Sequence, residues 1–143
     1  MAITQTLTDT FLQDCLDGGH NLGNGGNTLK IALYTLSASL GATTSAYTTS
    51  NEVSGTGYTA GGATLSSQAV AYDATNQVAF FDAADPAFTT ATITARGALI
   101  YNNSKSNASI AVLDFGSDFT STAGTFTIQL PSAAHNTAII RIS

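Results

Sequence analysis

Short runs of β-branched and aromatic residues, separated by turn-forming residues, recur along most of this chain and constrain its fold more than any other feature. Such runs are typical of strands, because branched and aromatic side chains pack well on a pleated surface. Roughly seven or eight runs, with turns about every 8–12 residues, predict a mostly β fold, an antiparallel β-sandwich of the jelly-roll or immunoglobulin-like kind. The expected strands are residues 29–36, 63–73, 76–83, 88–102, 109–116, 124–131 and 136–143.

Polar turns indicate which runs are neighbours in the sheet. The segment 73–76 contains an Asp and an Asn that favour a tight turn, which predicts a hairpin between the two runs that flank it. The polar segment 102–107 joins two longer runs in the same way. Pro131 cannot donate to a β-ladder, so we expect the strand before it to end there.

One segment near the start of the chain predicts a helix. Thr8 or Asp9 can cap its N-terminus, and Gly18 can end it in the left-handed conformation. A helix this short has to dock its apolar side on another element. We expect Cys15 to be a small hydrophobic core residue of that side rather than a nucleophile. The expected apolar face comprises Phe11, Leu12, Cys15 and Leu16.

A connector rich in Gly and Asn, residues 21–28, follows the helix. Chains of this composition are flexible, so the arm and helix at 2–16 could extend to a neighbouring molecule. We therefore divide the chain into an N-terminal arm with a short helix, residues 1–28, and a β-sandwich, residues 29–143. The two parts together form a single domain.

Residues 37–62 contain no clear element, and a loop of about 25 residues is usually functional or held by a partner. It leads into the Gly-rich stretch NEVSGTGYTAGGATL at 51–65. A phosphate-binding loop would need a following helix, or a Gly-Lys-Ser/Thr sequence, and a dinucleotide site would need a third glycine where Ala60 stands. The hypothesis of a phosphate site therefore fails. We expect Gly55 and Gly57 instead to let Tyr58 lie against a neighbouring subunit.

The residues that could support catalysis have simpler explanations. A serine nucleophile needs a histidine base and an acid, but His20 follows a helix stop and His135 lies in a turn, so we expect both to be solvated or capping. Paired carboxylates at strand ends beside Gly, Pro or Ala commonly form turns, with a metal or acid–base role as the alternative. We expect no catalytic residue, no cofactor and no metal site. The paired carboxylates are Asp82, Asp85, Asp114 and Asp118.

Arg96 lies inside an otherwise apolar run and is followed by Gly97. It either points outward or pairs with a carboxylate at an interface, since its planar guanidinium can bind a carboxylate through two hydrogen bonds. Glu52 is the only glutamate in the chain and opens the Gly-rich stretch. We therefore predict an Arg96–Glu52 pair.

Charged residues make up only 9% of the chain, against roughly 25% in an ordinary soluble domain. The four Lys and Arg residues are scattered and the net charge is −5, so we expect no direct binding of nucleic acid. No apolar run approaches the roughly 18 residues of a membrane span, and the first residues do not resemble a signal peptide. A surface rich in hydroxyls and amides suits a protein that packs against copies or partners.

Three blocks, at residues 30–65, 92–103 and 111–142, together with the opening FLQDCLDGGHNL, occur in this order. With these blocks the chain resembles a family of small structural proteins from the virions of tailed bacteriophages and prophages. The resemblance implies a structural protein without catalytic residues. The more specific expectation is a capsid decoration, or cement, protein.

A protein of this kind would be made in the host cytoplasm and would bind the outer surface of the capsid as a dimer or trimer. There it would clamp neighbouring subunits of the major capsid protein. A tail, adaptor or other virion component is the first alternative, and a host-glycan-binding or depolymerising module is the second. The chain has no Trp for an exposed aromatic platform, which counts against the second alternative. The residues expected at interfaces are Phe11, Leu12, Glu52, Gly55, Gly57, Tyr58 and Arg96.

Overall fold

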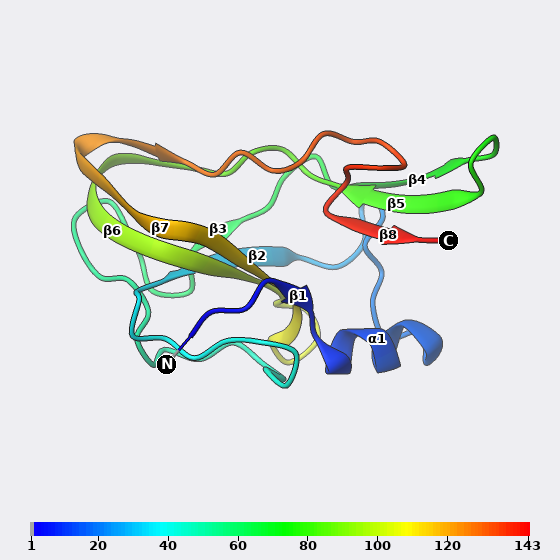
Figure 1. Cartoon of the computed structure of the whole chain (residues 1–143), viewed down its shortest axis with the longest axis horizontal. Helices are drawn as coiled ribbons and strands as arrows, with labels where there is room; N and C mark the ends of the chain where they lie inside the picture. Colours follow the sequence, from blue (N-terminus) through cyan, green and yellow to red (C-terminus); the bar gives the residue numbers. More distant parts are fainter. Residues whose placement is uncertain (1) are drawn as a thin grey trace.

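The computed structural model describes residues 2–143 as two antiparallel β-sheets and one short helix (Figure 1). The expectation of a mostly β, sandwich-like antiparallel fold with a short N-terminal helix is confirmed. The larger sheet has the order β1-β7-β6-β2-β3 and the smaller sheet the order β4-β5-β8. The elements are β1 (Thr6–Leu7), α1 (Asp9–Leu16), β2 (Leu29–Tyr34), β3 (Ala63–Thr64), β4 (Ala69–Asp73), β5 (Val78–Asp82), β6 (Ala87–Asn102), β7 (Ala108–Thr127) and β8 (Ile140–Ile142).

Two long strands, β6 and β7, form a hairpin that curves back on itself at the end of the molecule away from α1 (Figure 1). Their pairing shifts register at four places, and such bulges bend a strand and increase its twist. The separate strand expected at 124–131 is wrong, because β7 continues through Gly116 as far as Thr127. The glycine has φ +82° and lies in the register shift between the Gly97–Asp114 and Ala95–Phe119 pairs, so β7 bulges there and then pairs with β6 again.

Strand β2 is buried on both faces of the larger sheet. Leu29, Ile31 and Leu33 point into the main hydrophobic core, whereas Ala32 and Tyr34 point into a second cluster on the opposite side. This alternation follows from the two-residue period of a strand. The sequence shows it as a nearly continuous apolar run, which is typical of a strand covered on both faces.

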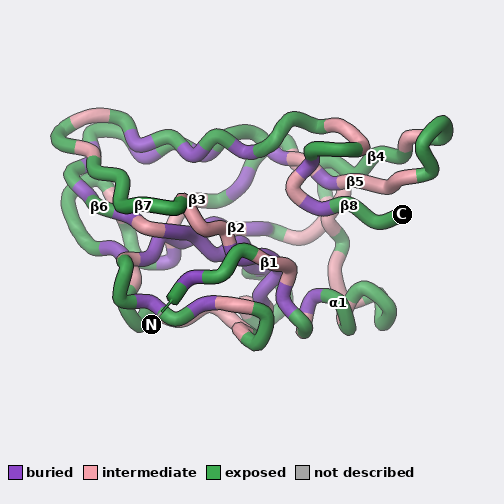
Figure 2. Tube along the Cα trace, in the orientation of Figure 1, coloured by how far each residue is buried: buried purple, intermediate pink, exposed green. Residues whose placement is uncertain are grey.

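Each face of the larger sheet has its own cover (Figure 2). Phe81 and Ile140 of the smaller sheet belong to the main core. The opposite face is covered by Leu40, from the long loop, and by Ile3, from the N-terminal arm, with Tyr47 packed at the side. The long loop is therefore a layer of the fold.

Helix α1 begins where the sequence predicts, with Thr8 as its N-cap. The Thr8 hydroxyl accepts a hydrogen bond from the Phe11 amide at 3.3 Å, which satisfies one of the free N–H groups of the first turn. Phe11 is the one residue of the helix that is buried, so it faces the chain's own core rather than an interface. The expectation that Cys15 lies in the core is wrong: it is exposed, because the helix docks through Phe11 alone, and Leu12 and Leu16 are exposed with it.

The N-terminal arm is part of the larger sheet. Thr6 pairs with Val112 of β7, and Ile3 forms a bridge with Leu40. The expectation that the arm extends to a neighbouring molecule is wrong for the described residues, because its backbone bonds are made within the chain. The connector is also anchored, since the Gln68 side chain donates to three of its carbonyl groups. Met1, the first residue of the predicted arm, lies outside the described residues.

Candidate interaction surfaces

The long loop at 37–62 is attached to the larger sheet by backbone hydrogen bonds. The Val53 amide donates to the Leu33 carbonyl at 2.9 Å, and the Thr35 amide donates to the Asn51 carbonyl at 3.0 Å. These bonds bring Glu52 beside Tyr34 at the end of β2. The sequence predicted a loop without clear strands that is functional or held by a partner. In the structure, the buried side chains of this loop pack against the chain's own larger sheet.

Glu52 is the centre of a polar cluster that holds this loop together. One carboxylate oxygen accepts from the Tyr58 hydroxyl at 2.6 Å and from the Gly61 amide at 2.7 Å. The other accepts from the Tyr47 hydroxyl at 2.7 Å. Burial, together with the neighbouring carboxylate, raises the pKa of both tyrosines far above the usual range. Both hydroxyls therefore remain hydrogen-bond donors at any ordinary pH.

Two further contacts connect this cluster to β2 and β6. The Tyr58 hydroxyl accepts from the Leu33 amide at 2.9 Å. Tyr101 stacks on Tyr47, with ring centroids 4.8 Å apart, and donates its hydroxyl proton to the Gly61 carbonyl at 2.7 Å. We name Glu52, Tyr47, Tyr58 and Tyr101 the Glu52 clasp. It is an internal anchor of the loop.

The glycines of the same stretch lie against the chain's own strands. Gly57 has φ +82°, and a Cβ built on it would lie 2.6 Å from the Ala91 Cα of β6. A Cβ on Gly62 would collide with the carbonyl oxygen of Ile31 in β2, and Gly55 abuts β6 in the same way. These glycines therefore let the loop pack closely on β6 and β2 of its own chain. Gly55 and Gly57 are nonetheless exposed, so the contact of this stretch with a neighbouring subunit stays a prediction.

Arg96 and Glu52 are not brought together. The Arg96 Nε donates to the Asp114 Oδ1 at 3.3 Å, and both side chains are somewhat more than one-quarter exposed. The pairing of Gly97 with Asp114 in the β6–β7 ladder places the two charges side by side. The Gly116 amide, and after it Arg96, lowers the pKa of Asp114. The Arg96–Glu52 pair is wrong within the chain, because each group already has a partner.

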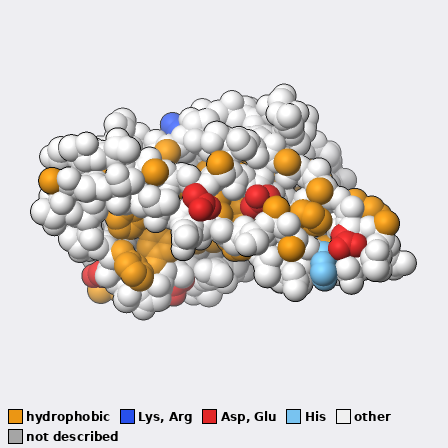
Figure 3. Space-filling model, turned by 90° about the horizontal axis from the view of Figure 1, so that it is seen from above, with side chains coloured by type: hydrophobic (Ala, Val, Ile, Leu, Met, Phe, Trp, Pro, Cys, Tyr) orange, Lys and Arg blue, Asp and Glu red, His pale blue; other side chains and the backbone are white. Residues whose placement is uncertain are grey.

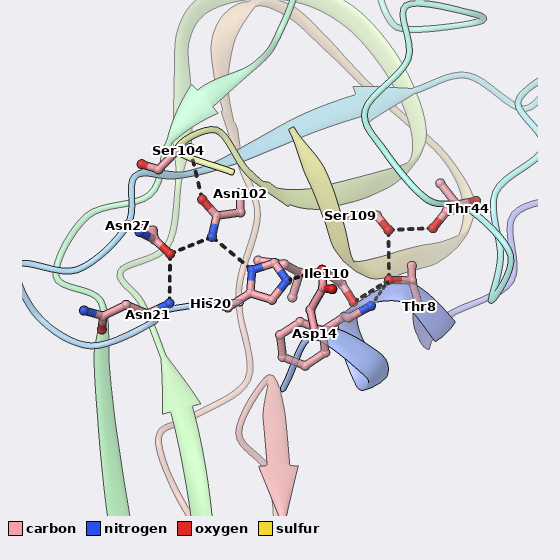
Figure 4. Close-up of polar contacts among 11 residues, drawn as sticks. Thr8, Asp14, His20, Asn21, Asn27, Thr44, Asn102, Ser104, Ser109 and Ile110 are labelled. Atoms are coloured by element: carbon pink, nitrogen blue, oxygen red, sulfur yellow. Dashed lines mark hydrogen bonds and ion pairs between the residues drawn. The ribbon is translucent and has the colours of Figure 1, made fainter. Parts of the chain in front are cut away.

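The side chain of His20 is buried, although its position after a helix stop predicted a solvated or capping residue. Its Nδ1 accepts from the side-chain amide of Asn102 at 2.9 Å, and its Nε2 lies 3.2 Å from the Asp14 Oδ2 without the alignment of a hydrogen bond (Figure 4). The Asn102 side chain is oriented by Asn27 and by the Ser104 amide. The geometry therefore places the ring proton on Nε2.

Burial has the largest effect on the pKa of His20. Its side chain is 1% exposed, and the centroid of its ring lies 5.1 Å from the centroid of the Phe11 ring. Burial lowers the pKa of His20, and Asp14 opposes that effect. A neutral histidine that joins α1 to the end of β6 is a structural connection, and the sequence carries no signal for it.

Two of the other candidate catalytic residues, His135 and Asp85, stabilise turn and loop segments. His135 Nδ1 lies 3.2 Å from the Asp73 Oδ2 at the β4–β5 hairpin. Asp73 in turn accepts from the amides of Thr75 and Asn76, which closes the expected tight turn. Asp85 accepts from the Leu130 amide at 2.8 Å. Among residues 2–143, no three His, Cys, Asp or Glu side chains form a group that could hold a metal ion.

A groove of about 620 Å³ lies along β7 and the segment that follows it. Asp114 is the one charged residue of its lining. Phe115 contacts Phe119 edge-on, with centroids 6.3 Å apart, and Phe119 is 51% exposed. Figure 3 shows hydrophobic side chains gathered in a hollow toward one end of the molecule. We call this feature the β7 groove; the sequence placed these residues in strands and did not predict it. Its apolar lining includes Leu113, Phe115, Phe119, Phe126 and Leu130.

The smaller sheet leaves a second apolar surface uncovered. Tyr72, Ala79 and Ile142 lie in one row across its three strands, next to the row of Val70, Phe81 and Ile140. Phe81 and Ile140 are buried, whereas Val70, Tyr72 and Ile142 are each more than half exposed. The sheet therefore extends beyond the core that it covers.

Comparison with protein-family models, with curated proteins and with solved structures gave no significant match for this chain. Within the described residues, no helix combines the length and the apolar character needed to cross a membrane.

Proposed function

We propose that this chain is a structural protein of a tailed-phage virion, specifically a capsid decoration protein that binds the outer surface of the head. Its partners are the major capsid protein and copies of itself. The resemblance of three sequence blocks to small virion proteins supports this proposal, as does the low content of charged residues. Two separate apolar surfaces, the β7 groove and the outer part of the smaller sheet, support it further.

The β7 groove is the observation that carries the proposal. Phe119 is half exposed in a hollow that it shares with Thr, Ser and Gln side chains and a single charged residue. An exposed aromatic residue in such a setting is typical of a site that another protein covers. Covering the exposed half of Phe119 contributes roughly 1 kcal/mol. We assign this groove to the capsid and the smaller sheet to contacts between copies.

A modest contact of this kind is sufficient when it is repeated. A protein that bridges two capsid subunits makes its second contact as an intramolecular event, at a high effective concentration. Many such bridges over one shell resist outward pressure, although each single contact is weak. This is the mechanism by which we propose that the chain stabilises the head.

The test is binding to purified particles. Heads that lack this chain are incubated with the wild-type protein, with Phe119→Ser, and with Leu36→Ser as a control of similar exposure, 53% against 51%. We expect Phe119→Ser to bind at least about fivefold more weakly, and Leu36→Ser to bind normally. Equal binding by both variants contradicts the assignment of the groove.

Location on the particle separates the alternatives. Immunogold labelling of purified virions should place the chain on the head. Label confined to tails favours the tail or adaptor alternative. Binding on a glycan array, or release of reducing sugar, without particle association favours the host-recognition module.

A further inference from the structure

Strand β4 is an edge strand with a free outer side. It pairs with β5 on one side, and no bridge or backbone hydrogen bond within residues 2–143 engages the other side. The β4–β5 hairpin projects from the body (Figure 1), and the tube in Figure 2 is coloured as exposed along most of β4. A strand in this position presents a row of unpaired amide and carbonyl groups.

The usual protections of an edge strand are missing from β4. Natural proteins place Lys, Pro or a β-bulge on an exposed edge to prevent pairing with another chain. The segment Ala69–Asp73 contains neither Lys nor Pro, and its pairing with β5 runs through five consecutive residues without a shift. Val70 and Tyr72 are 55% and 63% exposed. The edge is regular, apolar and open.

A second copy of the same strand is the partner that this sequence fits. Antiparallel pairing centred on Ala71 places Val70 opposite Tyr72 of the other copy, twice. Pairs of an aromatic and a β-branched residue are favourable in this position. The same register places Asp73 opposite Ala69, so that no like charges face each other. A two-fold axis through Ala71 makes the contact identical for both copies, as in most homodimers.

We infer that β4 pairs with β4 of a second copy, antiparallel and centred on Ala71, to form one six-stranded sheet. The strand order is β8-β5-β4 followed by β4-β5-β8 of the other copy. The apolar row of Tyr72, Ala79 and Ile142 then continues over both halves. The inference rests on the proposed function only for the assignment of the smaller sheet to contacts between copies; binding of the head through the β7 groove does not depend on it.

Cysteine cross-linking tests the register in purified protein. The exposed Cys15 is first replaced by Ser, and Ala71→Cys is then compared with Ala69→Cys, a matched exposed alanine of the same strand. In the inferred register the two cysteines introduced at position 71 face each other within reach of a disulfide. The two introduced at position 69 are separated by four positions along the strand, about 13 Å, which no disulfide spans. We expect a covalent dimer from Ala71→Cys and none from Ala69→Cys under mild oxidation.

Charged substitutions test the same register through association. Val70→Lys and Tyr72→Glu each remove two cross-strand pairs and should each weaken the dimer about tenfold by sedimentation velocity. Mixing the two variants places the introduced lysine opposite the introduced glutamate once and retains one original pair. The mixture should therefore dimerise more strongly than either variant alone. Circular dichroism of each variant checks that these exposed substitutions leave the fold intact.

The outcomes are distinct. A wild-type chain that is monomeric at all concentrations, a trimer, or equal cross-linking at both cysteine positions overturns the inference. A monomer that still binds heads through the β7 groove overturns the inference and leaves the proposed function standing. A dimer in the inferred register that binds no particle supports the inference and overturns the proposed function.

Discussion

Replacement of Glu52 by Ala tests the Glu52 clasp. The substitution removes the acceptor of two tyrosine hydroxyls and of the Gly61 amide, at distances of 2.6–2.7 Å. Hydrogen bonds to a charged acceptor contribute roughly 1.5–3 kcal/mol each. The Tyr58 hydroxyl keeps its bond from the Leu33 amide, and water can reach part of the site, so the full sum is not expected. We expect a loss of about 3–4 kcal/mol in the free energy of unfolding.

The assay is urea unfolding. All variants are fitted with one common slope of unfolding free energy against urea concentration, so that differences in the midpoint urea concentration report differences in stability. A loss of about 3–4 kcal/mol corresponds to a fall of about 10 °C in Tm for a chain of this size. Asp118→Ala is the control, since Asp118 is an exposed acid of β7 and its replacement should cost less than about 0.5 kcal/mol.

A double-mutant cycle tests whether the loss of stability in Glu52→Ala comes from its hydrogen bonds to the tyrosines. Tyr47→Phe removes a single hydrogen bond to Glu52, so the cycle of Glu52→Ala with Tyr47→Phe should give a coupling of about 1 kcal/mol. The reasoning is refuted if Glu52→Ala costs no more than Asp118→Ala, or if the cycle gives no coupling.

Two further predictions concern buried contacts. Burial lowers the pKa of His20, so the unfolded chain takes up its proton first; stability should be complete above about pH 6.5 and fall as the pH drops below it. His20→Gln should make stability less dependent on pH below about pH 6.5, and an unchanged pH dependence there would contradict the buried neutral ring. Gly57→Ala should cost about 1–3 kcal/mol more than Gly25→Ala, because the two glycines share a positive φ but only Gly57 is crowded by β6. Equal losses in thermal unfolding would show that crowding at Gly57 has no effect.

Local signals predicted the elements whose causes are local. The helix has its N-cap at Thr8 because that side chain bonds an amide three residues later, and the turn after Asp73 closes through its own side chain. The apolar run of β2 also predicted a buried strand correctly. These features depend on a few consecutive residues, so the sequence contains their explanation.

The features that the sequence did not reveal depend on distant contacts. His20 is held in the interior by a hydrogen bond from Asn102, which lies 82 positions further along the chain. Glu52 and Arg96 were paired by charge, but ladder register gave Arg96 a nearer carboxylate in Asp114. The helical pattern predicted an apolar face, but it does not indicate that only Phe11 of that face packs against the core. In each case the decisive neighbour is set by the topology.

The central claim is that this chain is a decoration protein of the phage head, and a cryo-EM reconstruction of the virion tests it most directly. The account predicts density for this chain on the outer surface of the shell, with the β7 groove against the major capsid protein. Density for this chain on the tail alone, or a complete particle without it, would contradict the claim.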